Sequence, residues 1–270
     1  MNPNAYRRIS RFAVTFIAAA TLNVSAVSAQ QQPSDNDLAQ ANNPLANFVA
    51  FNVQNYWIPR LYGLPDDTAN YLWLRGVVPA GRWLIRASVP VPTVPSSDPT
   101  VLDSVSGLGD VNAFAAYTLT KPGATRMIGV GPLLAAPTAT DDALGSGKWQ
   151  GGAAAVVFDF SSPKVQWGTL LTWQASFAGD DDREDTNLLV FQPFYIFQLG
   201  KGLYLRSTAI WAFNLEQNTY NMPFGLGIGK VLVNKNTVYN FFVEPQFTFL
   251  HRGVGEPELQ IFAGINMQFK

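Results

Sequence analysis

The chain has 270 residues, of which only 14% are charged and 13% are aromatic, and it contains no cysteine. Its formal net charge of −1 gives no basic surface for nucleic acid, and no disulfide, thiolate metal site or cysteine nucleophile can form. Because an ordinary soluble domain carries about 25% charged residues, this composition favours a membrane protein.

The N-terminus has the pattern of a secretory signal peptide. Arg7, Arg8 and Arg11 form a positive region, an apolar stretch runs from Phe12 to about Leu22, and Val27-Ser28-Ala29 supplies small residues for cleavage. We therefore predict a signal peptide over residues 1–29 and export through the general secretory route. An N-terminal membrane anchor is the alternative, but the apolar run is short for a spanning helix. Cleavage would leave 15 basic residues against 19 acidic ones.

Residues 30–45 are rich in Gln, Asn and Asp. One interpretation is a disordered polar leader in the periplasm, because such a segment has little apolar surface to bury. The other is a plug that folds into the lumen of a barrel. The sequence leaves both open, and we place the barrel itself over residues 46–270.

The rest of the chain alternates apolar and polar residues over long stretches, which is the pattern of β-strands. Mean hydropathy is only +0.05, and no stretch after the signal peptide approaches the ~20 apolar residues of a transmembrane helix. Alternation over ten or more residues suits a tilted strand that crosses a bilayer, with one face toward lipid and the other toward the lumen. We predict twelve strands, with ten or fourteen as alternatives, near 46–57, 69–79, 81–92, 110–120, 125–137, 148–160, 164–178, 186–199, 202–214, 220–232, 237–251 and 257–269.

Short and long connections alternate between these strands. Short turns such as Pro79-Ala80-Gly81 are followed by longer polar loops such as 93–109, and in outer-membrane barrels the short turns face the periplasm. A soluble β-sandwich would carry charged residues on its outward face, which most of these strands lack. We therefore predict an all-β fold, an up-and-down transmembrane antiparallel β-barrel in the outer membrane of a Gram-negative cell. Aromatic residues near the strand ends would form its interfacial girdle: Trp57, Trp83, Trp149, Trp167 and Tyr239.

The alternation places several polar residues on the lumen side. An Arg or Lys that faces lipid at the midplane costs about 2–4 kcal/mol, so an inward orientation is expected. These side chains either line an open pore and set its selectivity or pair across the lumen and fill a closed core, and both interpretations stay open. The predicted lumen-lining residues are Arg75, Arg86, Gln174, Arg206, Glu244, Gln246 and Gln260.

Several short motifs resemble an outer-membrane family labelled for the meta-pathway of phenol degradation, whose members are often called transporters. The motifs are GLGDVN (107–112), IGVGP (128–132), PTATDDALGSGKW (137–149), SFAGD (176–180), QPF (192–194) and GLGIGK (225–230). The resemblance covers roughly residues 44–269 and implies a barrel channel for small hydrophobic compounds. The motif residues singled out are Gly107, Gly109, Asp110, Thr140, Asp141, Asp142, Gly145, Gly147, Lys148 and Trp149. One departure is the C-terminus, where Lys270 follows the terminal aromatic Phe269 that the barrel assembly machinery would read.

The sequence gives only weak evidence for a catalytic site or a metal site. His251 is the only histidine, and no motif joins it to Ser176 or Ser207 and to Glu244 or Glu256 as catalysis would require. An acidic cluster in a predicted outer loop could bind a divalent cation between lipopolysaccharide molecules, although a solvated loop is the simpler interpretation: Asp180, Asp181, Asp182, Glu184 and Asp185.

The sequence thus predicts a non-enzymatic, cofactor-free outer-membrane channel for passive transport of small, hydrophobic or aromatic molecules. A closed structural barrel for envelope maintenance is the alternative, and a lipid-modifying enzyme is a third hypothesis. The expected partners are outer-membrane lipids, lipopolysaccharide, the barrel assembly machinery and the small-molecule permeant.

Overall fold

A computed structural model describes residue 34 and residues 38–43, 48–96, 104–121 and 123–269. All of them belong to one compact unit, Pro33–Lys270. The predicted signal peptide, residues 1–29, lies outside the described residues, as does part of the polar segment 30–45. Among the residues that the structure describes, no helix is long and apolar enough to cross a membrane.

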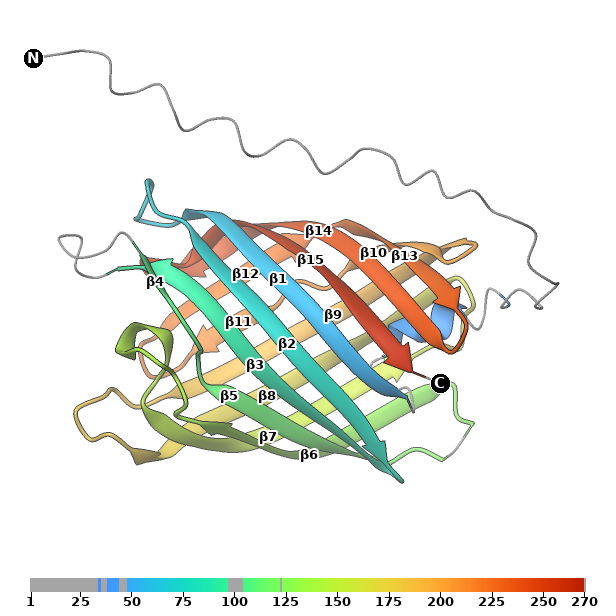
Figure 1. The fold of residues 1–270 in the computed structure, drawn as a ribbon, viewed down its shortest axis with the longest axis horizontal. Helices are drawn as coiled ribbons and strands as arrows, with labels where there is room; N and C mark the ends of the chain where they lie inside the picture. The colour runs from blue at the N-terminus through green and yellow to red at the C-terminus, as the bar shows by residue number, and fades with distance from the viewer. Residues whose placement is uncertain (1–33, 35–37, 44–47, 97–103, 122, 270) are drawn as a thin grey trace, which may run out of the picture. The chain divides into compact units, whose positions relative to one another are not determined.

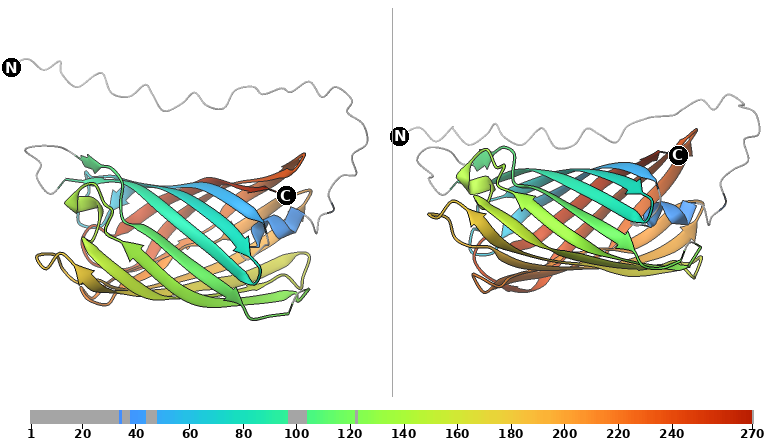
Figure 2. Two further views of the ribbon diagram at one scale, coloured as in Figure 1. Left: turned by 60° about the horizontal axis from the view of Figure 1, so that its bottom comes forward. Right: turned by 90° about the horizontal axis from the view of Figure 1, so that it is seen from below.

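The described chain is a closed antiparallel β-barrel (Figures 1 and 2). Two short 3₁₀ helices accompany the strands, η1 (Gln40–Asn42) and η2 (Asp142–Leu144). The strands are β1 (Val49–Leu61), β2 (Ala69–Ala80), β3 (Trp83–Pro95), β4 (Ser104–Ser106), β5 (Val111–Thr118), β6 (Arg126–Ala136), β7 (Lys148–Asp159), β8 (Val165–Gly179), β9 (Asn187–Gly200), β10 (Leu203–Ser207), β11 (Trp211–Asn214), β12 (Thr219–Gly225), β13 (Gly227–Asn234), β14 (Thr237–Arg252) and β15 (Pro257–Phe269).

These segments make twelve barrel strands, because three strands are each interrupted once. β4 and β5 form the fourth, β10 and β11 the ninth, and β12 and β13 the tenth. β15 returns to pair with β1, from Val49 opposite Phe269 to Leu61 opposite Pro257, and this pairing closes the wall. The predicted fold class and strand number are confirmed.

Apolar and polar residues alternate along the strands, so the apolar side chains lie on the outer face and the polar ones on the inner face. On β14, Phe241, Val243 and Phe247 are exposed, whereas Glu244 and Gln246 have no exposed surface. Trp57, Trp83, Trp149 and Trp167 are likewise exposed near strand ends, where an interfacial girdle would lie. The outer face therefore presents apolar and aromatic side chains, and the polar side chains are turned inward.

Several strand boundaries differ from the sequence prediction: the fourth and tenth strands, predicted to be continuous over 110–120 and 220–232, begin at Ser104 and Thr219 and are each interrupted. The first strand extends to Leu61 rather than ending at residue 57, with register shifts between Trp57 and Arg60 and between Arg60 and Leu61. An ion pair of 3.3 Å between Arg60 and Glu258 of β15 accompanies this extension.

The ninth strand was predicted to be continuous over 202–214 but is broken. The ladder between the ninth and tenth strands stops at the pair Arg206–Gly227 and resumes at Ala212–Asn221. Inside this break the Thr208 N–H donates to the Glu244 carboxylate at 2.7 Å instead of to a neighbouring strand, so a lumenal side chain replaces a ladder hydrogen bond.

Candidate functional site in the barrel lumen

The inner face of the barrel is divided into two kinds of lining. One side is apolar and is formed mainly by strands β2 to β8, with a core cluster of Val77, Leu84, Phe114, Ala116, Leu133, Ala154, Val156 and Leu170. The other side follows β14, β15 and β1, where Gln, Asn and Glu side chains alternate with Phe242, Phe262 and Tyr56. The lumen therefore contains an apolar cluster on β2 to β8 and a mainly polar lining on β14, β15 and β1.

The strongest polar network centres on Glu244. One carboxylate oxygen accepts from Arg206 Nε at 2.8 Å and from Thr208 Oγ1 at 2.7 Å. The other accepts from the Thr208 backbone N–H and from Gln246 Nε2 at 3.0 Å, and Gln260 Nε2 in turn donates to Gln246 Oε1 at 2.7 Å. Four donors thus satisfy this fully buried carboxylate, as a buried charge requires.

Glycines on β13 make room for this network. A Cβ atom at Gly227 would overlap Glu244, and one at Gly229 would overlap the Tyr204 ring. Tyr204 has no exposed surface, and its hydroxyl donates to Asn240 Oδ1 at 2.5 Å. Gly227 and Gly229 of the GLGIGK motif have no side chain, so Glu244 and Tyr204 can pack directly against the backbone of β13.

A second network lies on β1, β2 and β15. Gln54 Nε2 donates to Asn266 Oδ1 at 2.7 Å, and Arg75 Nη1 donates to Gln54 Oε1. The Arg75 guanidinium also lies 4.6 Å from the Trp73 ring, and that of Arg86 lies 4.4 Å from the Phe114 ring. No ion pair in the described part of the chain includes Arg75 or Arg86.

All seven residues predicted to face the lumen lie on the inner face. Arg206, Glu244, Gln246 and Gln260 form one network, whereas Arg75 and Arg86 belong to a separate region. Gln174 lies nearer the loop end, where its Nε2 donates to Gln150 Oε1. One of the three arginines is therefore paired with a carboxylate, and the choice between an open pore and a closed core stays a prediction.

The segment around η1 lies inside the barrel at the end with the short turns (Figure 2). Ala39 and Ala41 are buried, and their backbone carbonyls accept from lumenal amides. Gln166 Nε2 donates to Ala39 O at 3.1 Å, and Gln268 Nε2 donates to Ala41 O at 3.1 Å. Asn240 Nδ2 donates to Asn42 Oδ1 at 2.9 Å. Three strands thus hold residues 38–43 by side chains that point inward.

The family motif residues hold the outer loops together. The Asp110 carboxylate accepts from the N–H groups of Thr138, Ala139 and Ser146 and from Ser146 Oγ, at 2.7 to 3.2 Å. The Thr140 hydroxyl accepts from Leu108 N–H at 3.0 Å, and a Cβ atom at Gly107 or Gly145 would overlap Thr140 or Ala139. GLGD and PTATDDALGSGKW therefore form one folded loop pair, although 38 residues separate Gly107 from Gly145.

The remaining motif residues extend this structure toward the next loop. Asp141 caps η2 by accepting from Ala143 N–H at 2.9 Å, and Arg183 donates to the carbonyls of Asp142 and Gly145 at 2.6 and 2.5 Å. Gly147 has a φ of +69°, in the left-handed region that favours glycine. Lys148 is buried and forms a 3.4 Å ion pair with Asp185, whereas Trp149, next along β7, is exposed.

The acidic loop does not converge on a cation position. Asp180 caps the Asp182 N–H at 3.0 Å, and Asp185 accepts from Ser176 Oγ at 3.0 Å. The hydrogen bond from Ser176, together with Lys148, holds the pKa of Asp185 below its usual value. Among the described residues, which include Asp180, Asp181, Asp182 and Asp185, no group of three His, Cys, Asp or Glu side chains could hold a metal ion.

The weak catalytic candidates are not assembled either. His251 is exposed and stacks on Tyr62 with a ring separation of 3.4 Å. Glu244 already accepts hydrogen bonds from Arg206 and Thr208, and the Ser176 hydroxyl donates to Asp185. Burial raises the pKa of Glu256, which also interacts electrostatically with His251, but no hydrogen bond in the described chain joins this pair to Ser176 or Ser207.

Several lumenal residues were not singled out from the sequence. Tyr56, Ser88, Gln166, Asn240 and Gln268 all lie on the inner face and are buried. Alternation alone placed Gln166, Asn240 and Gln268 inward, but their role depends on residues 38–43, which are more than 120 positions away in the chain.

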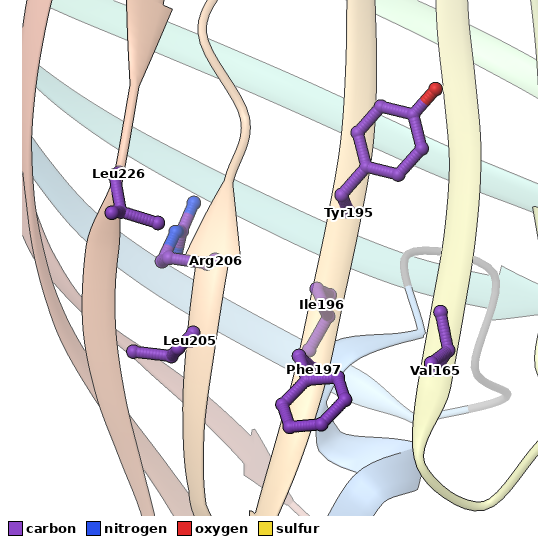
Figure 3. Close-up of a pocket in the computed structure, with 7 residues that line it drawn as sticks. All are labelled: Val165, Tyr195, Ile196, Phe197, Leu205, Arg206 and Leu226. Carbon is purple, nitrogen blue, oxygen red and sulfur yellow. The ribbon is translucent and has the colours of Figure 1, made fainter.

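A shallow hollow lies at the wall between β8, β9 and the broken strands (Figure 3). Tyr195, Phe197 and Leu226 line it and are exposed on the outer face, whereas Ile196 and Arg206 belong to the inner face. The outer lining of this hollow is therefore apolar.

The barrel has the architecture of solved outer-membrane channels. It is similar to the COG4313 outer membrane channel from Pseudomonas putida F1, with a TM-score of 0.56 and 14% identity over 83% of this chain and 97% of that one. It is also similar to the NanC porin, with a TM-score of 0.52 and 10% identity over 82% of this chain and 99% of that one. The chain therefore shares its β-barrel fold with these outer-membrane proteins.

At these identities the likeness concerns the β-barrel fold alone. The sequence matches no protein family and no curated protein. The label for phenol degradation therefore stays a prediction that rests on the motif residues.

Proposed function

We propose that this protein is an outer-membrane channel for passive movement of small molecules with an apolar or aromatic part. The observation that carries the proposal is the two-sided lumen, in which Asn240, Glu244, Gln246 and Gln260 lie on a polar side that faces an apolar wall around Phe114. Small-molecule sites in proteins combine mostly apolar walls with a few fixed polar groups, and such a lining suits a solute with both characters.

We further propose that residues 38–43 narrow the channel at the end with the short turns. Gln166 and Gln268 donate hydrogen bonds to the carbonyls of this segment, and these contacts support a plug rather than a free leader. In an outer-membrane orientation this end would face the periplasm. The plug would then set the conductance of the channel.

Conductance of the purified barrel in planar lipid bilayers tests both proposals. Wild-type protein should give small, long-lived single-channel steps, and deletion of residues 38–43 should increase the step size at least twofold. Gln166→Ala with Gln268→Ala should act in the same direction, because two of the amides that hold the segment are lost, and exposed Gln217→Ala serves as the control. No conductance from either wild type or the deletion would contradict a channel and favour the closed structural barrel.

A further inference from the structure

One region of the lumen, on β1, β2 and β3, contains four buried polar atoms without a hydrogen-bond partner. The buried atoms Arg75 Nε, Arg86 Nε, Tyr56 Oη and Ser88 Oγ accept or donate no hydrogen bond. Buried polar groups in folded proteins are nearly always satisfied, so four unsatisfied groups on three adjacent strands call for a ligand or water. All four can donate a hydrogen bond, and this shared property indicates an acceptor.

Strand register brings three of the four side chains together, and Tyr56 lies on the next strand, where its register partner is Tyr71 of β2. Arg75 of β2 is directly opposite Ser88 of β3, and Arg86 is opposite Val77, one inward position further along β2. Tyr56, on the neighbouring strand β1, interacts electrostatically with both Arg75 and Arg86. The donors therefore face one part of the lumen.

The region carries positive charge that no carboxylate neutralises. Arg75 and Arg86 repel each other electrostatically, and no ion pair of the described residues includes them. Glu244, the one acidic residue that interacts with Tyr56, already accepts four hydrogen bonds from Arg206, Thr208 and Gln246. Two guanidinium groups without a counter-ion in a partly water-excluded space favour an anion, above all one that accepts two parallel bonds.

The residues around the two arginines are aromatic and aliphatic, and they indicate which body the anion should carry. Arg86 stacks on Phe114, which belongs to the apolar cluster with Val77 and Leu84, and Tyr56 stacks on Phe262 with a ring separation of 4.2 Å. An anion held by the arginines would therefore have rings and aliphatic side chains beside it. A strongly hydrated inorganic anion gains nothing from such neighbours, whereas a carboxylate on an aromatic or aliphatic body does.

We propose that Arg75, Arg86, Tyr56 and Ser88 form a lumenal binding site for small carboxylates that carry an apolar body. The site names the class of permeant for the channel and so rests on the proposed function. Bound there, the carboxylate accepts from the guanidinium and hydroxyl groups, and its body lies against Phe114 and the apolar side. Arg75 is pre-positioned for this by its bond to Gln54, which Asn266 holds in turn.

Isothermal titration of the folded barrel in detergent micelles with sodium benzoate tests the site directly. Wild type should bind benzoate, and Arg75→Gln and Arg86→Gln should each weaken binding at least tenfold. Arg82→Gln is the matched control, because Arg82 is exposed at the turn of the same hairpin and donates to Thr118 and Leu119 carbonyls. Heat-modifiable gel migration verifies that each variant has folded.

Tyr56→Phe gives a second variant that keeps the ring stack and removes only an unpartnered hydroxyl, so its folding should be unaffected. It should weaken benzoate binding about threefold. Benzyl alcohol, which has the ring without the charge, and sodium chloride, which has the charge without the ring, should both compete poorly. Binding that is equal in wild type and both arginine variants would overturn the site, as would displacement of benzoate by equimolar chloride.

Bilayer recordings separate this proposal from the channel itself. Benzoate binding without ion conductance would contradict the channel and leave the site in place. Conductance without benzoate binding would overturn the site and leave the channel in place.

Discussion

Arg206 and the pair Arg75 and Arg86 lie on the inner face of the same barrel, but only Arg206 has a counter-ion. Its guanidinium meets a carboxylate with four donors and packs 3.8 Å from the Phe242 ring. Arg75 and Arg86 have aromatic neighbours and no carboxylate. The first region is internally satisfied and therefore structural, whereas the second is incomplete and therefore available to a ligand. Identical residue types on one inner face thus serve opposite purposes according to their partners.

The largest expected effect comes from breaking the satisfied region. Glu244→Ala should lower the free energy of unfolding by about 3–5 kcal/mol, because it leaves the buried Arg206 charge and the Thr208 N–H without an acceptor. Urea denaturation followed by gel migration of unboiled samples measures this loss. The double variant Glu244→Ala with Arg206→Ala should recover part of it, since the unpaired charge is then gone. A loss below about 1 kcal/mol would show that Glu244 is not the centre of the network.

A similar test at the outer loops should give a smaller loss. Asp110→Ala removes a carboxylate that accepts four hydrogen bonds, and we expect a cost of about 2 kcal/mol because the site is partly exposed. Faster protease cleavage within residues 137–147 would report it. Asp142→Ala is the control, because the Asp142 side chain is 97% exposed, and equal cleavage of both variants would contradict the role of Asp110.

The incomplete region should respond in the opposite direction. Arg86→Gln removes an uncompensated charge while keeping a polar side chain, so the free energy of unfolding should rise by about 1 kcal/mol. The same urea assay applies, without added benzoate. A loss as large as that of Glu244→Ala would mean that Arg86 has a stabilising partner and that the two regions are alike.

The smallest effect concerns pH at the loop end. The pKa of Asp185 is lowered by the Ser176 hydrogen bond and by Lys148, so its contribution to stability is complete above the ordinary Asp pKa of about 3.9 and is lost as pH falls through the folded value. Amide hydrogen exchange at Thr186, whose N–H donates to Ser176 Oγ at 3.0 Å, should accelerate only in that acidic range relative to Asp185→Asn. An identical pH profile in the variant would exclude this coupling.

The sequence predicted the wall better than the lumen. Strand number and fold class follow from alternation, since a period of two determines which residues share a face. Alternation cannot report the break between β10 and β11, because the Thr208 N–H leaves the ladder for a side chain 36 residues away. Nor can it show that Asp110 and Ser146 meet.

Alternation also cannot predict which lumenal side chains pair with one another. Arg75, Arg86 and Arg206 are equivalent in pattern, and only the register of β2, β3, β10 and β14 decides which of them reaches Glu244. The position of residues 38–43 was equally hard to predict, because this segment has no periodicity of its own and its place depends on hydrogen bonds from Gln166 and Gln268.

The pairing of β1 with β15 has a consequence for the order in which the barrel assembles. Val49 pairs with Phe269, so the last contact to form joins residues 220 positions apart, and contacts of such separation make folding slow. Until they form, β1 and β15 each present an unpaired edge, which is a template for other chains. A chain that stops before residue 257 lacks β15, so β1 and β14 would stay unpaired and could recruit other chains.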